Sequence, residues 1–279
     1  MFKKCFIIII LVFFGWIGFF IIFPNVSKLK KEAPSKTSFM EYREREWQEK
    51  GKTIRIKQIW VPLSRISPYL IKAVIIAEDD KFWHHEGFDL EAIQKAMEKD
   101  LKAGKFKAGG STISQQLAKN LYLTPSKNPV RKIKETIITW RIEQTLSKKR
   151  IIELYLNVVE WGEGIFGAEA AARHYFGKSA GSLTPEESAR LAVVLPNPRK
   201  MNPAGNSPYV AKRAGIIQEI MIRRGIVIPG YEEVMAPNEG REEEINHPPT
   251  IKTEGTPPSV IHNSVKEQGG EEIQGRGVK

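Results

Sequence analysis

Hydrophobic residues recur at three- and four-residue intervals through most of residues 68–225, which is the spacing of α-helices that bury one face. Leu70, Val74 and Ala77 form one such stripe, and Ser67-Pro68 supplies a cap and a proline at the first helical position. We therefore predict a mainly α-helical fold. Further helices are predicted to start at Asp89, Gly109-Gly110-Ser111, Asn128-Pro129, Ser147, Gly167, Thr184 and Ser207-Pro208.

The pattern changes at both ends of this helical region. Residues 53–62 alternate apolar and polar side chains and predict a short strand. Residues 25–52 are charged and hold few core residues, which predicts a connecting, partly helical segment. Residues 229–279 are rich in Gly, Pro, Glu, Asn and Gln and are predicted to be disordered, because they cannot bury enough apolar surface. The folded domain is thus predicted to span residues 53–228.

The first residues of the chain predict a membrane anchor. Residues 5–24 carry no charge and are almost entirely Ile, Phe, Leu, Val, Gly and Trp, and about 20 such residues can cross a bilayer as one helix. Residues 1–4 would then be a cytoplasmic stub. A cleaved signal peptide is the alternative, but Ile22-Phe23-Pro24 is a poor cleavage site. Lysines lie on both sides of the run, so lysine counting leaves its orientation open.

The net charge of +11 is unevenly distributed along the chain. Residues 229–279 hold ten Glu against five Lys or Arg, so the preceding residues carry about +16. A basic domain suits nucleic acid or anionic lipid, and a protein tethered to a bilayer meets lipid phosphates first. No nucleic-acid-binding motif occurs in the sequence, so we predict a membrane partner and no nucleic acid. The single cysteine, Cys5, excludes disulfides within this sequence and cysteine-ligated metals.

The segment from Glu78 to Gly87 is the first candidate for chemistry. It closes an apolar helix with four acidic residues and two histidines, which is typical of a site, although a solvated helix end has the same composition. We predict no metal here, because adjacent His84 and His85 lack the i, i+4 spacing of a helical zinc site.

The segment from Gly109 to Asn120 is the second candidate. Glycines ahead of a helix leave backbone N–H groups free, and the helix dipole favours an anion there. Ser111, Gln115 and Lys119 are spaced by four and are predicted to share one face, suited to a phosphate or a sugar. The ending of a nucleotide P-loop is missing. A capped helix with a polar outer face is the alternative.

Two later segments are less distinctive. Residues 127–135 hold four cations and one acid, and Arg131 and Glu135 are four apart and could simply pair on the surface. Residues 149–177 hold core residues together with Asn157 and several glycines, which predict tight packing or an unusual turn beside a cleft.

Together and in this order, these segments resemble the glycosyltransferase family that polymerises peptidoglycan, over about residues 37–225. In one departure, the loop arginine usual in the family is replaced by Lys127, which keeps the charge but loses the guanidinium fork. The matching positions are Glu78, Asp79, Phe82, His85 and Gly87 for E-D-x-x-F-x-x-H-x-G; Gly109 to Gln116 with Lys119-Asn120 for G-G-S-T-I-[ST]-Q-Q; Arg131, Lys132 and Glu135 for R-K-x-x-E; Tyr155 to Phe176 for the Y-L-N…Y-F block; and Leu195 to Pro198 at the end.

The resemblance implies a lysozyme-like helical domain that elongates glycan strands from a polyprenyl-pyrophosphate-linked disaccharide-pentapeptide. It forms β-1,4 bonds with inversion and releases polyprenyl pyrophosphate. Glu78 is the implied general base, and Glu135 is the second carboxylate, which orients cations or the donor. The other implied roles are substrate binding by Ser111, Gln115, Gln116, Lys119, Lys127, Arg131, Lys132 and Lys134, and support of the site by Asp79, Phe82, His85, Gly110 and Asn157.

The same resemblance implies a single-pass protein of the cell inner membrane, with its domain on the periplasmic side. The implied partners are the lipid-linked precursor, the growing glycan chain, the membrane and other cell-wall synthesis proteins. No cofactor is implied as a requirement, although a divalent cation at the pyrophosphate stays open.

Two other functions compete with this one. A lysozyme-like peptidoglycan hydrolase or lytic enzyme also uses a carboxylate in a helical fold, but it has no need for the cations between Lys119 and Lys134. A non-catalytic membrane scaffold could bind anionic lipid through the same cations, but it requires no carboxylate among them. The cluster of cations and carboxylates therefore discriminates the three.

Lys127 allows a test of the resemblance at the position where the chain departs from it. If Lys127 contacts the donor pyrophosphate, Lys127→Ala should lower the polymerisation rate strongly, whereas Lys127→Arg should keep or raise it. Initial rates measured at one salt concentration distinguish the cases. Equal rates for the wild type and both variants would remove Lys127 from the site, since exposed positions tolerate such changes.

Overall fold

The computed structural model describes residues 22–103, 110–126 and 128–227, with the side chains of residues 99–103 excepted, and isolated positions before residue 22. Most of the predicted anchor and Lys127 therefore lie outside the described residues. Among the residues that are described, no helix is both long and apolar enough to cross a membrane.

The chain divides into two units, Met1–Glu232 and Glu233–Lys279. The second unit belongs to the predicted tail, and residues 228–279 lie outside the described part of the chain. All structural statements below concern the first unit.

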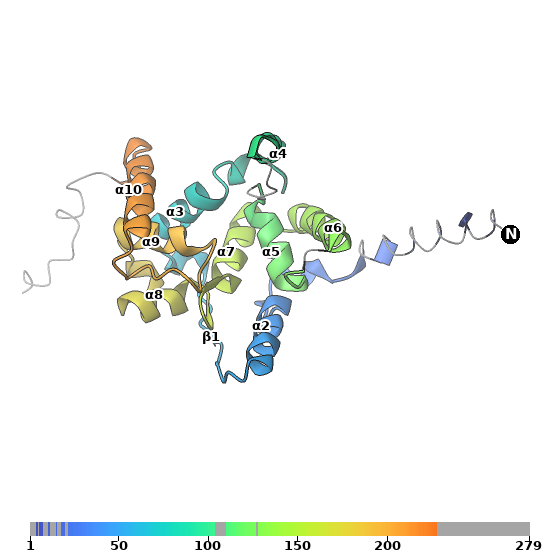
Figure 1. The fold of residues 1–279 in the computed structure, drawn as a ribbon, viewed down its shortest axis with the longest axis horizontal. Coiled ribbons are helices and arrows are strands. Elements are labelled where there is room, and N and C mark those ends of the chain that lie inside the picture. Colours follow the sequence, from blue (N-terminus) through green and yellow to red (C-terminus); the bar gives the residue numbers. More distant parts are fainter. Residues whose placement is uncertain are drawn as a thin grey trace, which may run out of the picture. The chain divides into compact units, whose positions relative to one another are not determined.

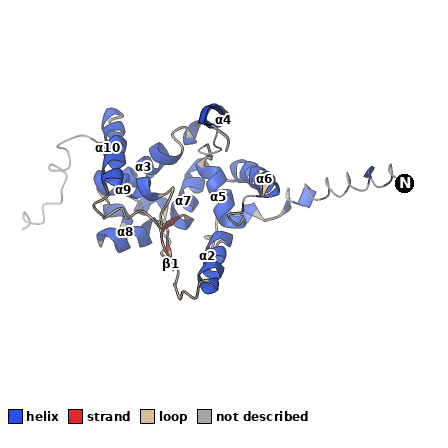
Figure 2. Ribbon diagram, viewed as in Figure 1, coloured by secondary structure: helices blue, strands red, loops and turns tan. Residues whose placement is uncertain are grey.

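The first unit is mainly helical, as predicted (Figures 1 and 2). Five of the predicted helix starts are capped as expected, because the side chains of Asp89, Asn128, Ser147, Thr184 and Ser207 each accept a backbone N–H of the helix that follows. The predicted side-chain cap at Ser67 is wrong, because its hydroxyl donates instead to the carbonyl oxygen of Leu183. The helices are α2 (Ser38–Glu49), α3 (Pro68–Glu78), α4 (Leu90–Ala103), α5 (Ile113–Tyr122), α6 (Pro129–Thr145), α7 (Lys148–Val158), α8 (Ala168–Phe176), α9 (Pro185–Val194) and α10 (Pro208–Arg223), with 3-10 turns η1 (Val26–Lys30), η2 (Leu63–Arg65), η3 (Phe82–His84) and η4 (Ala180–Ser182).

The predicted strand over residues 53–62 is wrong in extent. Only β1 (Lys57–Gln58) is a strand, and it pairs in parallel with β3 (Ile165–Phe166), which pairs antiparallel with β2 (Glu160–Gly162). The ladder is short because β3 offers only two residues for pairing. The alternating Ile54 and Ile56 instead pack against a small cluster beside this sheet.

The segment predicted to be a connection, residues 25–52, contains a helix that belongs to the fold. Met40 and Trp47 of α2 are almost fully buried and pack with Phe166 of β3. Thr37 caps α2 by accepting the N–H of Met40. The folded unit therefore begins before residue 53, because α2 covers apolar surface that the later residues would otherwise expose.

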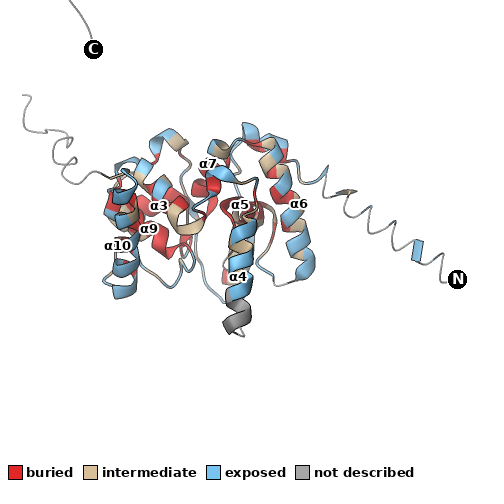
Figure 3. Ribbon diagram, turned by 90° about the horizontal axis from the view of Figure 1, so that it is seen from above, coloured by how far each residue is buried: buried red, intermediate tan, exposed pale blue. Residues whose placement is uncertain are grey.

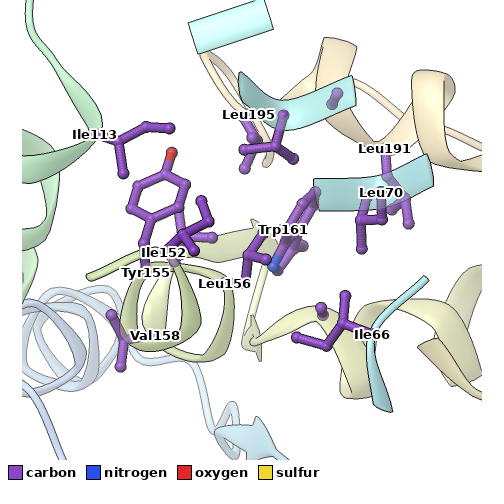
Figure 4. Packing of buried hydrophobic residues seen from close by; sticks show 14 of the residues in the cluster. Ile66, Leu70, Ile113, Ile152, Tyr155, Leu156, Val158, Trp161, Leu191 and Leu195 are labelled. Atoms are coloured by element: carbon purple, nitrogen blue, oxygen red, sulfur yellow. The ribbon is translucent and has the colours of Figure 1, made fainter. Parts of the chain in front are cut away.

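The main core includes the buried faces of α3, α5, α7 and α9, with α3 packed on α9 and α5 on α7, and buried positions are frequent on these helices in Figure 3. Figure 4 shows the packing around Tyr155 and Trp161, both fully buried, with Leu70 and Leu191 contributed by α3 and α9. This packing holds α3 at its apolar face, so the polar residues at its end occupy a defined position.

The predicted tight packing around Asn157 is confirmed. Its buried side chain accepts the N–H of Val61 and donates to the carbonyl oxygens of Val61 and Glu153. Gly167 lies directly against it with φ +82°, and a Cβ at Gly167 would stand 2.7 Å from the Asn157 carbonyl oxygen. Asn157 thus connects the segment that holds Val61 to α7 and supports the fold.

Candidate active site

Glu78 is the last residue of α3, and the apolar helix fixes where its carboxylate lies. Leu70, Ala73 and Val74 of α3 are fully buried in the core. The helix ends at Glu78, and the N–H of Asp79 bonds to the carbonyl oxygen of Ile75. A side chain at the end of such a helix has little freedom to move away, because its backbone is held by the packed turns before it.

Asp79 and His85 hold the loop that follows α3. The Nδ1 atom of His85 accepts the N–H of Gly87 at 3.0 Å, so in the neutral ring the proton is on Nε2. That Nε2–H donates to Asp79 Oδ1 at 2.9 Å. Asp79 Oδ2 in turn accepts the backbone N–H of Ile113, the first residue of α5, at 2.9 Å. The two segments predicted to carry chemistry therefore meet through Asp79.

Phe82 belongs to the same loop and anchors it in the core. It is fully buried, and the ammonium of Lys148 lies 4.7 Å from its ring centroid. Lys148 also pairs with the buried carboxylate of Glu143, which accepts the hydroxyl of Ser114. Glu143 fills the space beside Gly87, where a Cβ would stand 2.9 Å from its Cγ.

The start of α5 differs from the prediction. Thr112 is the N-cap and forms a capping box with Gln115, so the helix begins at Ile113. Ser111 precedes the helix, and the prediction that it shares a helix face with Gln115 and Lys119 is wrong. Gln115 is buried, with its amide oxygen accepting the N–H of Thr112. It therefore supports the cap rather than facing a ligand.

Gln116 is the residue of α5 that reaches Glu78. Its Nε2 donates to Glu78 Oε2 at 2.7 Å, and its Oε1 accepts the hydroxyl of Tyr155 at 3.0 Å. The Glu78 carboxylate only accepts, so it takes the amide N–H, and the amide oxygen is left to accept the Tyr155 hydroxyl, which helps to hold the amide in place. In Figure 4 the Tyr155 hydroxyl lies on the side of Ile113, toward α5.

Burial raises the pKa of the Glu78 carboxyl above its ordinary value. The hydrogen bond from Gln116 and the charge of Lys119 act in the opposite direction, and the nearby charge of Asp79 adds to the rise. A carboxylate with a raised pKa is a stronger base once it is ionised, which suits proton abstraction near neutral pH.

The cations cluster around a second carboxylate, Glu135 of α6, whose side chain is 4 % exposed. Arg131 Nη1 and Lys132 Nζ each bond to one of its two oxygens at 2.5 Å. Lys119 of α5 is half-buried near both carboxylates. Burial lowers the pKa of its ammonium and the nearby cations add to this, while Glu135 and Glu78 act to raise it. Lys134 of α6 is also half-buried.

An open pocket of about 230 Å³ adjoins Glu78. Asp79 and Asp80 line it from the loop after α3, and Gly110 and Ser111 line it from the approach to α5. Gly110 packs closely on the backbone of α4, with a Cβ position 3.4 Å from the Ala92 carbonyl oxygen. The pocket brings together the carboxylate and the predicted glycine-rich segment, but not Asn157, which lies in the core.

The sequence did not predict three residues that support the site. They are Tyr155, whose hydroxyl bonds to Gln116, and the ion pair of Glu143 and Lys148 beside Phe82. Tyr155 sits among apolar residues that predict core, and no local pattern connects it with Gln116, which lies 39 residues earlier. Glu143 and Lys148 lie five residues apart in different helices, a spacing that predicts no pairing.

The described residues offer no ready metal site. No three His, Cys, Asp or Glu side chains among them are grouped so that they could hold an ion. Both ring nitrogens of His85 are engaged, and both oxygens of Glu135 carry cations. These donors do not fit a resident metal, and we assign no step to one.

A half-buried carboxylate beside fixed cations suits acid–base chemistry on a substrate with an anionic group. Residues 46–222 match the family model described as transglycosylase, and the chain belongs to this family. It is 56% identical to a biosynthetic peptidoglycan transglycosylase of Dechloromonas aromatica over 184 residues, 66% of this chain and 80% of the relative. It is 49% identical to the one of Nitrosospira multiformis over 212 residues, 76% of this chain and 90% of the relative.

The Tyr155 hydroxyl is expected to set the pKa of Glu78. In Tyr155→Phe the Gln116 amide oxygen loses the hydrogen bond that helps to hold it in place, so the donation of Gln116 to Glu78 weakens. Because that bond lowers the pKa, the pKa of Glu78 should rise further. A pH titration of the side-chain carboxyl signals by NMR measures it, with Tyr209→Phe, an exposed tyrosine of α10, as the control. An unchanged pKa in Tyr155→Phe would show that the hydroxyl does not orient the amide.

Proposed function

We propose that the chain elongates the glycan strands of peptidoglycan from a polyprenyl-pyrophosphate-linked disaccharide-pentapeptide. Family membership and the names of the relatives support this class of reaction. The observation that carries the proposal is the carboxylate of Glu78, held by Gln116 and set beside the cations around Glu135.

Glu78 acts as the general base in this proposal. Gln116 occupies its Oε2, and we assign Oε1 to the 4-hydroxyl of the acceptor sugar. As that hydroxyl oxygen attacks the anomeric carbon of the donor, its proton passes to Glu78. A positioned base contributes about 10²–10⁴-fold to such a step. One attack from the face opposite the leaving group inverts an α-linkage into a β-1,4 bond.

The bond that breaks joins the anomeric carbon to the pyrophosphate oxygen, and its electron pair leaves with polyprenyl pyrophosphate. The negative charge that develops on this oxygen needs fixed cations in a partly desolvated site. We assign that task to Lys119, Arg131 and Lys132, which gather around Glu135, and we place Lys127 and Lys134 with them. If a divalent cation takes part, it would arrive with the pyrophosphate of the substrate.

Glu135 orients these cations rather than acting as a nucleophile. Both of its oxygens are bound, one by Arg131 and one by Lys132, and a carboxylate held by two cations is a poor nucleophile. This arrangement also favours transfer over hydrolysis, because a retaining or inverting hydrolase needs its second carboxylate free for the sugar or for water. A scaffold that only binds lipid has no use for the Gln116–Glu78 pair.

Residues 5–24 anchor the enzyme to the inner membrane as a single span in this proposal, with the folded unit on the periplasmic side. The uncharged apolar run supports the anchor, and a lipid-linked substrate explains the need for one. Other cell-wall synthesis proteins are proposed partners at the same membrane.

Glu78→Gln tests the base. The purified wild type, incubated in detergent with labelled lipid-linked precursor, should form slow-migrating polymer that muramidase digests. Glu78→Gln should lower the initial rate by about 10²–10⁴-fold, because an amide cannot accept the proton. Its melting temperature should not fall, since a neutral amide is cheaper to bury than a carboxylate.

Glu186→Gln, an exposed carboxylate of α9, provides the control and should polymerise like the wild type. If Glu78→Gln kept more than about a tenth of the wild-type rate, Glu78 could not be the base. If the wild type itself formed no polymer, the proposed function would be wrong.

Deleting residues 1–24 tests the anchor. The truncated protein should still polymerise precursor in detergent, while much less of it sediments with membrane vesicles at high salt. Full retention on vesicles at high salt would show that the folded unit attaches through its own apolar surface, and the anchor would not dominate attachment.

A further inference from the structure

A salt bridge joins the end of α10 to the loop that follows Glu78. Arg224, directly after α10, donates to both oxygens of Asp80, from Nη1 to Oδ1 at 2.5 Å and from Nη2 to Oδ2 at 2.9 Å. Asp80 lines the same pocket of about 230 Å³ as Glu78. The arginine fork therefore connects a residue 144 positions later in the chain with the wall of the proposed reacting centre.

The way α10 ends fixes the position of Arg224. The N–H of Gly225 bonds to the carbonyl oxygen of Ile222, and the N–H of Ile226 bonds to that of Met221, both at 2.9 Å. Gly225 has φ +64°, so the two bonds form a Schellman motif. Met221 is buried, and Ile226 packs against the same core. Because hydrogen bonds and apolar packing close this turn, the backbone that carries the guanidinium is well defined.

The fork is not needed to hold the loop in place. Asp79 already holds it, since its carboxylate bonds to His85 and to the backbone N–H of Ile113. The side chains of Arg224 and Asp80 are 47 % and 49 % exposed, and an ion pair so open to water adds little to stability. What the fork changes is the charge of the pocket wall.

The charges around the pocket give this pair its significance. Other carboxylates, among them that of Asp89, line the pocket as well. Lys81 also lines it, but its ammonium pairs with Glu91 of α4. The hydrogen bond from Arg224 is the main cause that holds the pKa of Asp80 below its ordinary value. Without this partner, Asp80 would add an uncompensated negative charge to a wall that is already acidic.

We propose that Arg224 is a positioning residue that holds Asp80 in an ion pair and so admits the anionic lipid-linked precursor to the pocket beside Glu78. The precursor carries a pyrophosphate and the carboxylates of its peptide, so a free carboxylate on the pocket wall would repel it. Arg224 acts through Asp80 and touches no reacting atom. The inference rests on the proposed function for the identity of the precursor.

Binding of fluorescently labelled lipid-linked precursor tests this role without turnover. The Kd is measured by microscale thermophoresis in detergent on the full chain carrying Glu78→Gln. In this background Arg224→Ala should raise the Kd about fivefold at low salt, the size expected for one uncompensated charge within about 10 Å of an anion in a partly desolvated pocket. The rise should shrink as salt is added, because mobile ions screen an exposed charge.

Two control variants accompany Arg224→Ala. Arg224→Lys keeps the positive charge and should bind like the Glu78→Gln background. Arg223→Ala removes the same charge from the exposed residue one position earlier and should leave the Kd unchanged. Melting temperatures check that each variant is folded. If Arg224→Ala does not fold, Arg224→Gln is titrated instead, and the same rise in Kd is expected.

Adding Asp80→Asn to Arg224→Ala separates charge from structure. The double change removes both charges and should restore the Kd of the background, because no uncompensated carboxylate is left. A fork that served only to hold the loop would not be restored in this way, and a double variant that binds as weakly as Arg224→Ala would overturn the inference. Equal Kd values with and without Arg224 would overturn it as well. If the wild type formed no polymer while Arg224→Ala still weakened precursor binding, the proposed function alone would be wrong.

Discussion

The hydrogen bond from the Ile113 N–H to Asp79 connects the end of α3 with the start of α5, and the geometry of the site follows from it. The first N–H groups of a helix have no partner inside the helix, and the dipole favours a negative charge beside them. Asp79 is 7 % exposed, so water competes little for this bond. Gln116 follows one turn later on α5, within reach of Glu78.

The two carboxylates of the proposed site lie in different electrostatic environments. Glu78 has one neutral amide as its partner, and burial raises its pKa, so it is able to take a proton. Glu135 is bound by Arg131 and Lys132 and serves to hold positive charge in place. Lys119 lies near enough to both carboxylates for its charge to interact with each. Because the environments differ, the proposed site can hold a base and a group of cations side by side.

Helix α2, which follows the apolar run of residues 5–24, contributes side chains next to the proposed site. It packs against α5, and its Phe39 and Arg43 line a pocket together with Gln116 and Lys119. The ion pair between Arg43 and Glu160 crosses 117 residues of chain and joins α2 to β2. A segment that joins the proposed anchor to the fold thus also shapes the pocket next to the proposed reacting centre.

The sequence alone determined the helices and the family. Capping residues such as Asn128 and Thr184 act within one helical turn, so their effect is visible locally. The order of the motifs led to the family and to the proposed roles of Glu78 and the cations. Only the tertiary structure decided which side chains meet: Tyr155 with Gln116, and Arg43 with Glu160, pair across 39 and 117 residues. Periodicity reports which face of a helix is buried but not which partner lies against it, because that depends on how all the elements pack together.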